Sequence, residues 1–172
     1  MRRIANAHRS YAHPLAWWFP DDGRELLFTA GHEGDGELRC WDTVSGLRVV
    51  DFEADEWLLV HNGALAPLPD GRLILATSDP DGLHRWDAHT GQSLGRNEST
   101  TIWHVTKVAG APRVIVASED ETVHQWNALT GEELAPPHPG GAAAAALRPD
   151  GTAVLATGSH DGALRLDELG TD

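Results

Sequence analysis

Basic residues, cysteines and long apolar runs are all scarce in this sequence, and each scarcity excludes a class of protein. The 172 residues include 13 Lys and Arg against 26 Asp and Glu, a formal net charge of −13. Because phosphate binding needs a basic surface, this balance argues against a nucleic acid or an anionic membrane as a partner. The single cysteine, Cys40, excludes an intrachain disulfide framework and a cysteine-rich zinc or iron–sulfur site.

No apolar segment approaches the length that crosses a membrane, and the longest weakly apolar stretch runs only from Ala142 to Leu147. The N-terminus, MRRIANAHRSYAHPLAWW, starts with basic residues but lacks the apolar core of a signal peptide. The hydrophobic content of 41% is sufficient for a folded core. We therefore expect a soluble, cytoplasmic protein.

Tryptophan, in contrast, is plentiful: there are seven Trp against three Phe and one Tyr. Three of them begin similar segments, WDTVSG at Trp41, WDAHTG at Trp86 and WNALTG at Trp126, each with a glycine five residues after the Trp. The Trp residues of these segments are 45 and then 40 residues apart. A period of this size is the signature of a repeat architecture.

Turn residues precede a β-rich run in every copy of the repeat: ELLFTAG, RLILATS, RVIVASE and TAVLATG. Short runs of this kind, bounded by turns, predict strands. The segment GGAAAAALRP at 140–149 conflicts with this pattern, because alanine favours helix. Its place in the repeat nevertheless predicts a strand. The single domain divides into four repeats, at approximately 5–46, 47–91, 92–131 and 132–172.

These segments resemble the WD-repeat β-propeller family. The resemblance is carried by DGELRCWD at 35–42 followed by TVSG, by HDGALRL at 160–166, and by the repeat period. The Ala-, Gly-, Asp- and Arg-rich composition is similar to that of bacterial members. The resemblance implies an all-β fold with blades of four antiparallel strands. About four blades are expected here, against about seven in a closed ring of the family, so the propeller would be partial or open.

In the family, a hydrogen-bonded set links the Trp to a Ser or Thr on the second strand, a His near the start of the blade and an Asp in a turn. No repeat contains the complete set, and in the fourth repeat Asp167 stands where Trp is expected. The resemblance assigns structural blade roles to His8, Asp35 and Trp41 in the first repeat, Ser78 and Trp86 in the second, Ser118, Asp120 and Trp126 in the third, and His138, Ser159 and Asp161 in the fourth.

Three aromatic residues are candidates for partner binding. Tyr11, Trp57 and Trp103 fall near the start of the first strand in repeats one to three, a region that lies at the blade rim in the family. Aromatic side chains on a rim are typical interface anchors. The alternative is that they cover blade tops or the contacts between blades.

The polar residues do not suggest catalysis, a cofactor or a metal. His84 and His124 both stand two residues before a Trp, where Arg39 and Arg165 stand in the other copies, so the repeat explains them better than a ligand set does. No nucleophile–base motif and no Gly-rich phosphate loop is present. For Cys40, beside Trp41, we expect a buried small hydrophobe rather than a reactive thiol.

The favoured function is a non-catalytic scaffold that mediates protein–protein interaction. The negative charge favours a basic protein partner, whose identity the sequence leaves unknown. Two alternatives remain open: a propeller-fold enzyme, a hydrolase or lyase with a site in the central channel, and a remnant of a longer propeller with no independent function. The short length also permits self-association, in which two chains dock head to tail and complete a ring. An open arc or a remnant is preferred over that ring.

Overall fold

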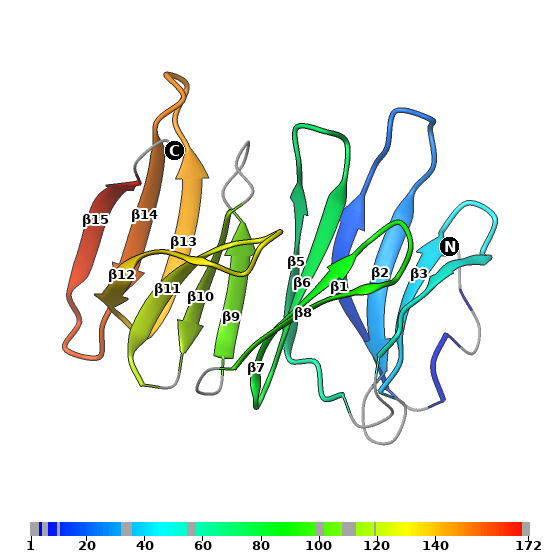
Figure 1. Cartoon of the computed structure of the whole chain (residues 1–172), viewed down its shortest axis with the longest axis horizontal. Helices are drawn as coiled ribbons and strands as arrows, with labels where there is room; N and C mark the ends of the chain where they lie inside the picture. Colours follow the sequence, from blue (N-terminus) through cyan, green and yellow to red (C-terminus); the bar gives the residue numbers. More distant parts are fainter. Residues whose placement is uncertain are drawn as a thin grey trace.

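The computed structural model describes residues 4, 7–9, 11–31, 36–54, 58–98, 102–107, 113–118 and 120–169. Within these ranges the chain forms strands and no helix, and the strands make four separate antiparallel sheets. The sheets follow one another in chain order, from right to left in Figure 1, and the first and fourth lie at opposite ends of the row. The expected all-β fold of about four blades in an open arrangement is confirmed.

Each sheet is a meander in which consecutive strands pair. The first three sheets have four described strands and the fourth has three. The strands are β1 (Ala12–Trp18), β2 (Leu26–Gly31), β3 (Leu38–Asp42) and β4 (Arg48–Asp51); β5 (Asn62–Pro67), β6 (Leu73–Asp79), β7 (Gly82–Asp87) and β8 (Ser93–Glu98); β9 (Ile102–Lys107), β10 (Arg113–Ser118), β11 (Thr122–Asn127) and β12 (Glu133–Pro139); and β13 (Ala142–Leu147), β14 (Ala153–Gly158) and β15 (Leu164–Leu169).

The alanine run is a strand, as its place in the repeat predicted. It forms β13 and pairs with β14 without a break, from Ala142 opposite Gly158 to Leu147 opposite Ala153. The hydrogen-bonding partner and the neighbouring sheet therefore override the helix propensity of alanine, which is a weak preference for each residue.

The two faces of each sheet have distinct neighbours. The third-strand tryptophans Trp86 and Trp126 pack against the preceding sheet, and the opposite face packs against the following sheet. We call these sides the Trp face and the forward face. By strand register, Trp41 lies opposite Leu27, Trp86 opposite Leu75 and Trp126 opposite Val114. Asp167 lies opposite Leu155 at the same position of the fourth sheet, so register aligns all four sheets.

The core lies between successive sheets, in three layers that we call seams. Each seam joins the forward face of one sheet to the Trp face of the next. The first seam includes Leu26, Phe28, Leu38 and Cys40 against Leu73, Leu75 and Trp86; the second includes Ala64, Ala66, Ile74 and Leu83 against Val114, Val116 and Trp126; the third includes Ile115, Ala117 and Val123 against Ala153 and Leu155.

A polar clasp also ties the second sheet to the third. Arg85 of β7 donates from Nη1 to the carbonyl of Leu129 at 2.6 Å and from Nε to Asn97 Oδ1 at 3.1 Å. Asn97 in turn donates from Nδ2 to the carbonyl of Gly131 at 2.6 Å. Since Arg85 is 5% exposed, these bonds satisfy a guanidinium that the seam has buried.

Three turns that precede second strands contain an Asp-Gly pair, at 22–23, 70–71 and 150–151, and share one geometry. In each, the carboxylate accepts a hydrogen bond from the backbone amide two residues on: Arg24 to Asp22, Arg72 to Asp70 and Thr152 to Asp150. These turns lower the pKa of all three carboxyls. The main cause is the amide of Arg24 for Asp22, the side chain of Arg72 for Asp70 and the amide of Thr152 for Asp150.

This geometry predicts a loss of stability in acid. A carboxyl whose folded-state pKa is lowered stabilises the fold above its unfolded pKa of about 3.9, and that contribution is lost as pH falls through the folded value. The melting temperature should therefore drop as pH is lowered from about 5 to about 2. The triple variant D22N/D70N/D150N keeps the oxygen acceptors but cannot titrate there, so its melting temperature should fall less steeply over the same range. Parallel curves for the two proteins would contradict the prediction.

No helix in the described part of the chain is long and apolar enough to cross a membrane.

Candidate functional site

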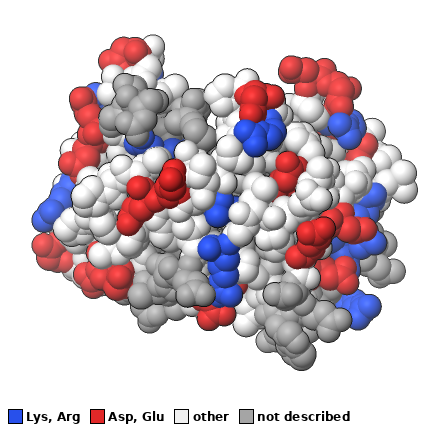
Figure 2. Space-filling model, viewed as in Figure 1, with Lys and Arg blue, Asp and Glu red and all other residues white. Residues whose placement is uncertain are grey.

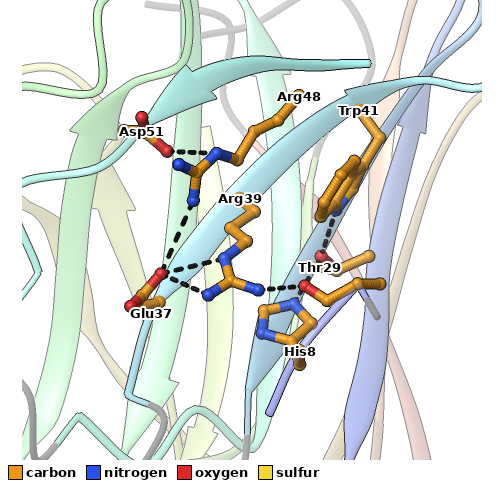
Figure 3. Close-up of polar contacts among 8 residues, drawn as sticks. His8, Thr29, Glu37, Arg39, Trp41, Arg48 and Asp51 are labelled. Atoms are coloured by element: carbon orange, nitrogen blue, oxygen red, sulfur yellow. Dashed lines mark hydrogen bonds and ion pairs between the residues drawn. The ribbon is translucent and has the colours of Figure 1, made fainter. Parts of the chain in front are cut away.

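The polar network expected from the repeat is present in the first sheet, with an acceptor that sequence analysis did not assign. Trp41 donates from Nε1 to Thr29 Oγ1 at 3.0 Å, and His8 Nε2 lies 2.8 Å from the same oxygen (Figure 3). His8 and Trp41 are thus brought together through Thr29. The parallel between ELLFTAG and RLILATS, each with Thr near its end, is the sequence signal for this residue. Asp35 lies outside the described residues.

In the second sheet the structure corrects the role given to Ser78. Trp86 donates from Nε1 to Thr77 Oγ1 at 2.9 Å, so the neighbouring residue is the acceptor. Because side chains alternate across a strand, Ser78 lies on the forward face, away from the indole. Ser78 is fully buried there.

The third sheet has the Trp without this hydroxyl. Trp126 is buried in the second seam, but Val116 occupies the register position of Thr77 and has no acceptor. Ser118 is buried at the end of β10. Asp120 accepts from the amide of Thr122, whose hydroxyl lies 2.8 Å from His124 Nε2. The Asp120 carboxylate and the Thr122 amide thus close the turn before β11.

In the fourth sheet the assigned residues separate into two places. Ser159 and Asp161 pair with each other in an exposed turn, where Asp161 also accepts from the amide of Ala163 at 2.9 Å. His138 belongs to β12 of the third sheet, and its Nδ1 lies 3.7 Å from Asp167 Oδ2. The Trp position is therefore filled by a carboxylate beside a histidine.

Arg39 holds the segment that precedes β1 against the first sheet. Its guanidinium binds the Glu37 carboxylate and the carbonyl of Ala7, and Arg48 Nε pairs with Asp51 at 2.8 Å nearby (Figure 3). At the matching position His84 Nε2 lies 3.0 Å from Asp79, and His124 Nδ1 lies 2.6 Å from Glu133. In the first three sheets, the residue at this position contacts groups of its own sheet and, in the first, also the segment that precedes β1. The described residues contain no group of three side chains suited to a metal ion.

Cys40 lies in the first seam, fully buried beside Leu38 and Phe28. Burial raises the pKa of its thiol to about 12. A thiol reagent should therefore modify native protein at pH 8 at least about 100-fold more slowly than protein unfolded in guanidinium, because the thiolate is the reacting species. The absorbance of the aromatic thiolate released from an aromatic disulfide reagent measures both rates. Complete reaction of the native protein on mixing would contradict the prediction.

The exposed apolar surface is concentrated on the two end sheets. Among the described residues, large apolar side chains stand exposed on the first sheet and its turns, on the fourth sheet, and at one position between the first and second sheets, while the second and third sheets contribute none. They are Tyr11, Trp17, Phe19, Val44, Leu47 and Val49; Leu147, Leu164 and Leu166; and Leu59.

The Trp face of the first sheet is hollowed. A pocket of about 440 Å³ lies there, lined by Pro14, Trp17, Leu27 and Trp41 among others. Trp17 is half exposed and stacks on Phe19, with ring centroids 5.8 Å apart. Tyr11, a predicted binding residue, is exposed just before β1. Trp57 lies outside the described residues, and of Trp103 only the backbone, in β9, is described.

The forward face of the fourth sheet is the second apolar surface. By register it carries Ala144 and Ala146 of β13, Val154 and Ala156 of β14, and Leu164 and Leu166 of β15, on one side of the sheet. The two leucines are 72% and 73% exposed. We call this surface and the hollowed Trp face of the first sheet the end faces.

No family model and no curated protein matches the chain. Solved structures do. The computationally designed Ika4 protein matches with a TM-score of 0.63 at 21% identity, covering 95% of this chain and 94% of that one. The computationally designed Ika8 protein matches with a TM-score of 0.62 at 22% identity, over 90% of this chain and 45% of that one. U3-55K, a WD40 protein, matches with a TM-score of 0.66 at 21% identity, over 95% of this chain and 52% of that one. The chain therefore spans about half the length of Ika8 and of U3-55K, and its fold is an unclosed, β-propeller-like array of four sheets.

Proposed function

We propose that this chain is a cytoplasmic, non-catalytic protein-interaction scaffold of the WD-repeat type, and that it contacts its partners through the two end faces. The observation that carries the proposal is the position of the exposed apolar side chains. In the middle sheets the equivalent surfaces are covered by neighbouring sheets, whereas at the ends Trp17, Leu164 and Leu166 are exposed. On the first sheet the central residues Trp41 and Thr29 are themselves buried. Contiguous exposed apolar surface on a folded domain is typical of interaction sites.

The polar groups of the structure support a scaffold rather than a reaction centre. The hydrogen bonds of Trp41 to Thr29 and of Trp86 to Thr77 hold strands together, and Arg85 and Asn97 hold sheets together. Acidic side chains are spread over the face shown in Figure 2, above both end and middle sheets. With a net charge of −13, such a surface favours association with a basic protein, chiefly through the association rate.

The test uses the full chain and three single variants that add one arginine. Leu164→Arg alters the forward face of the fourth sheet and Trp17→Arg alters the Trp face of the first. Gln92→Arg is the matched control, since Gln92 is exposed in the turn between β7 and β8 of the second sheet. A protein captured by the wild-type chain from cell extract is purified, and its affinity for each variant is measured by calorimetry.

The proposal predicts binding at least about 10-fold weaker for one or both end-face variants than for the control, equivalent to about 1.4 kcal/mol. Equal affinities for all three variants, or the absence of any purified protein that binds the chain, a second copy of the chain included, would overturn it.

A further inference from the structure

We infer that the end faces bind each other between two copies of this chain: the forward face of the fourth sheet docks on the Trp face of the first sheet of a second copy. Two such contacts close a ring of two four-sheet arcs. The inference rests on the proposed function, in that it takes the end faces as contact surfaces, and it names their partner as a second copy.

The forward face of the fourth sheet has the construction of the forward faces that are already buried in seams. Register places Leu164 and Leu166 at the positions held by Leu38 and Cys40 in the first sheet, Leu83 and Arg85 in the second, and Val123 and Gln125 in the third. The inner six are at most 5% exposed, and the two leucines are 72% and 73% exposed. One surface is thus repeated four times and covered three times.

The match extends to the other strands of the sheet. In the second sheet Ala64 lies opposite Ala76 and Ala66 opposite Ile74, and all four are buried against the third sheet. In the fourth sheet Ala144 lies opposite Ala156 and Ala146 opposite Val154, in the same register. Small residues on the first strand leave room for a tryptophan from the next sheet, as Trp126 shows in the second seam.

The opposite end of the chain carries the matching tryptophan, Trp41, which is 8% exposed in the single chain. In the first sheet Leu27, Thr29 and Trp41 hold the register positions of Leu75, Thr77 and Trp86, which form the Trp face in the first seam. Trp17 lies opposite Leu27, as the buried Leu65 lies opposite Leu75. These groups line a hollow of about 440 Å³, at which Trp17 is half exposed while Thr29 and Trp41 are buried, and the fourth sheet presents two exposed leucines. One chain therefore carries both halves of a seam.

Contacts between unlike ends form a closed ring when a whole number of copies completes the circle. The arc matches Ika8 and U3-55K over 45% and 52% of their lengths. Each of these longer chains is thus about two arcs long, and two copies of this chain have about that length. A closed ring leaves neither apolar end face in water, whereas a single bound copy would leave one of each.

The dependence of binding on salt concentration distinguishes a second copy of the chain from a basic partner. Two copies carry −13 each, so their mutual repulsion is screened as salt is added, and the apolar contact should strengthen. A complex with a basic protein should instead weaken with salt. The purified full chain is therefore studied by sedimentation velocity at about 50 µM protein in about 0.15 M and 0.5 M NaCl.

The expected species has twice the 18.6 kDa mass of one chain, and its proportion rises with salt. Leu164→Arg and Trp17→Arg should each raise the dimer dissociation constant at least about 10-fold, because each places a charged side chain in both apolar contacts of the ring. Gln92→Arg should leave it unchanged. Leu164 is chosen over Leu166 because Arg85 occupies the latter position in the second sheet and is accommodated in a seam. Circular dichroism melting of each variant shows that it is folded.

A mixture of the two end-face variants tests the head-to-tail geometry. In an equimolar mixture one intact fourth-sheet face meets one intact first-sheet face, so a species of twice the single-chain mass should reappear. If like faces met instead, only one of the two variants would dissociate and mixing would restore nothing. That result, larger open assemblies, or a monomeric wild type at both salt concentrations would overturn the inference. A monomeric wild type that still binds a purified partner through Leu164 or Trp17 would overturn it and leave the proposed function standing.

Discussion

Replacing Gly91 by alanine should reduce the free energy of unfolding by about 3 kcal/mol or more, the sum of backbone strain and a steric clash. Gly91 follows β7 and has a φ of +78°. A Cβ atom there would lie 2.0 Å from the carbonyl oxygen of Asp51, at the end of β4 in the first sheet. The backbone of Gly91 also accepts a hydrogen bond from the amide of Glu53 at 3.0 Å. The first seam would have to open to admit the methyl group.

Gly46 provides the matched control. It stands five residues after Trp41, as Gly91 does after Trp86, with a φ of +75° and the same turn hydrogen bond to the aspartate four residues before it. A Cβ at Gly46 would meet nothing within 4 Å. Gly46→Ala should therefore cost only the strain of a left-handed backbone, about 1–2 kcal/mol. Unfolding in guanidinium, followed by tryptophan fluorescence, measures both, and equal losses would show that Gly91 is not held by the seam.

Gly131 completes the series, because its seam contact is made with side chains. A Cβ there would lie 2.5 Å from Arg85 Nη2 and 2.8 Å from Asn97 Oδ1, the two members of the polar clasp. Side chains can move where a carbonyl cannot, at the expense of the clasp. The loss for Gly131→Ala should therefore fall between those for Gly46 and Gly91.

Truncating Trp86 to alanine should have an effect of similar size, about 3–5 kcal/mol. The side chain is 2% exposed in the first seam, where it meets Phe52 edge-on at a ring distance of 6.1 Å and stacks on His84 at 5.7 Å. Its removal leaves a cavity between two sheets. Because a domain of this size has a total stability of about 5–15 kcal/mol, thermal unfolding should shift by many degrees.

The hydrogen bond of Trp86 can be tested without that cavity. Thr77→Val keeps the shape of the side chain and leaves the indole N–H without its acceptor, at a cost of about 1–3 kcal/mol. Thr77→Ser retains the hydroxyl, so it should lose only what the missing methyl group contributes. A Val variant as stable as the wild type would show that the bond to Trp86 contributes nothing.

The sequence was sufficient for the strands, because their spacing and turns are local features. The turn aspartates and the Trp positions recur in register, and even the alanine run at 142–147 was placed by its position in the repeat. Ser78 shows where such reasoning is least exact. Side chains alternate along a strand, so an error of one residue moves a group to the opposite face, and the acceptor is Thr77. Thr29 was not assigned from the sequence because the connection between β2 and β3 is longer than that between β6 and β7. The distance along the chain from the Thr to the Trp therefore differs between the two repeats.

By itself, then, the sequence determined the repeat, its four copies, the all-β architecture and the apolar character of each blade face. Only the tertiary structure decided which of those faces are covered. Leu83 and Leu164 are the same residue type at the same register position, yet one is fully buried and the other is 72% exposed. Burial depends on the sheet that packs across a seam, and that sheet comes from another part of the chain, so the local sequence of a strand does not determine it.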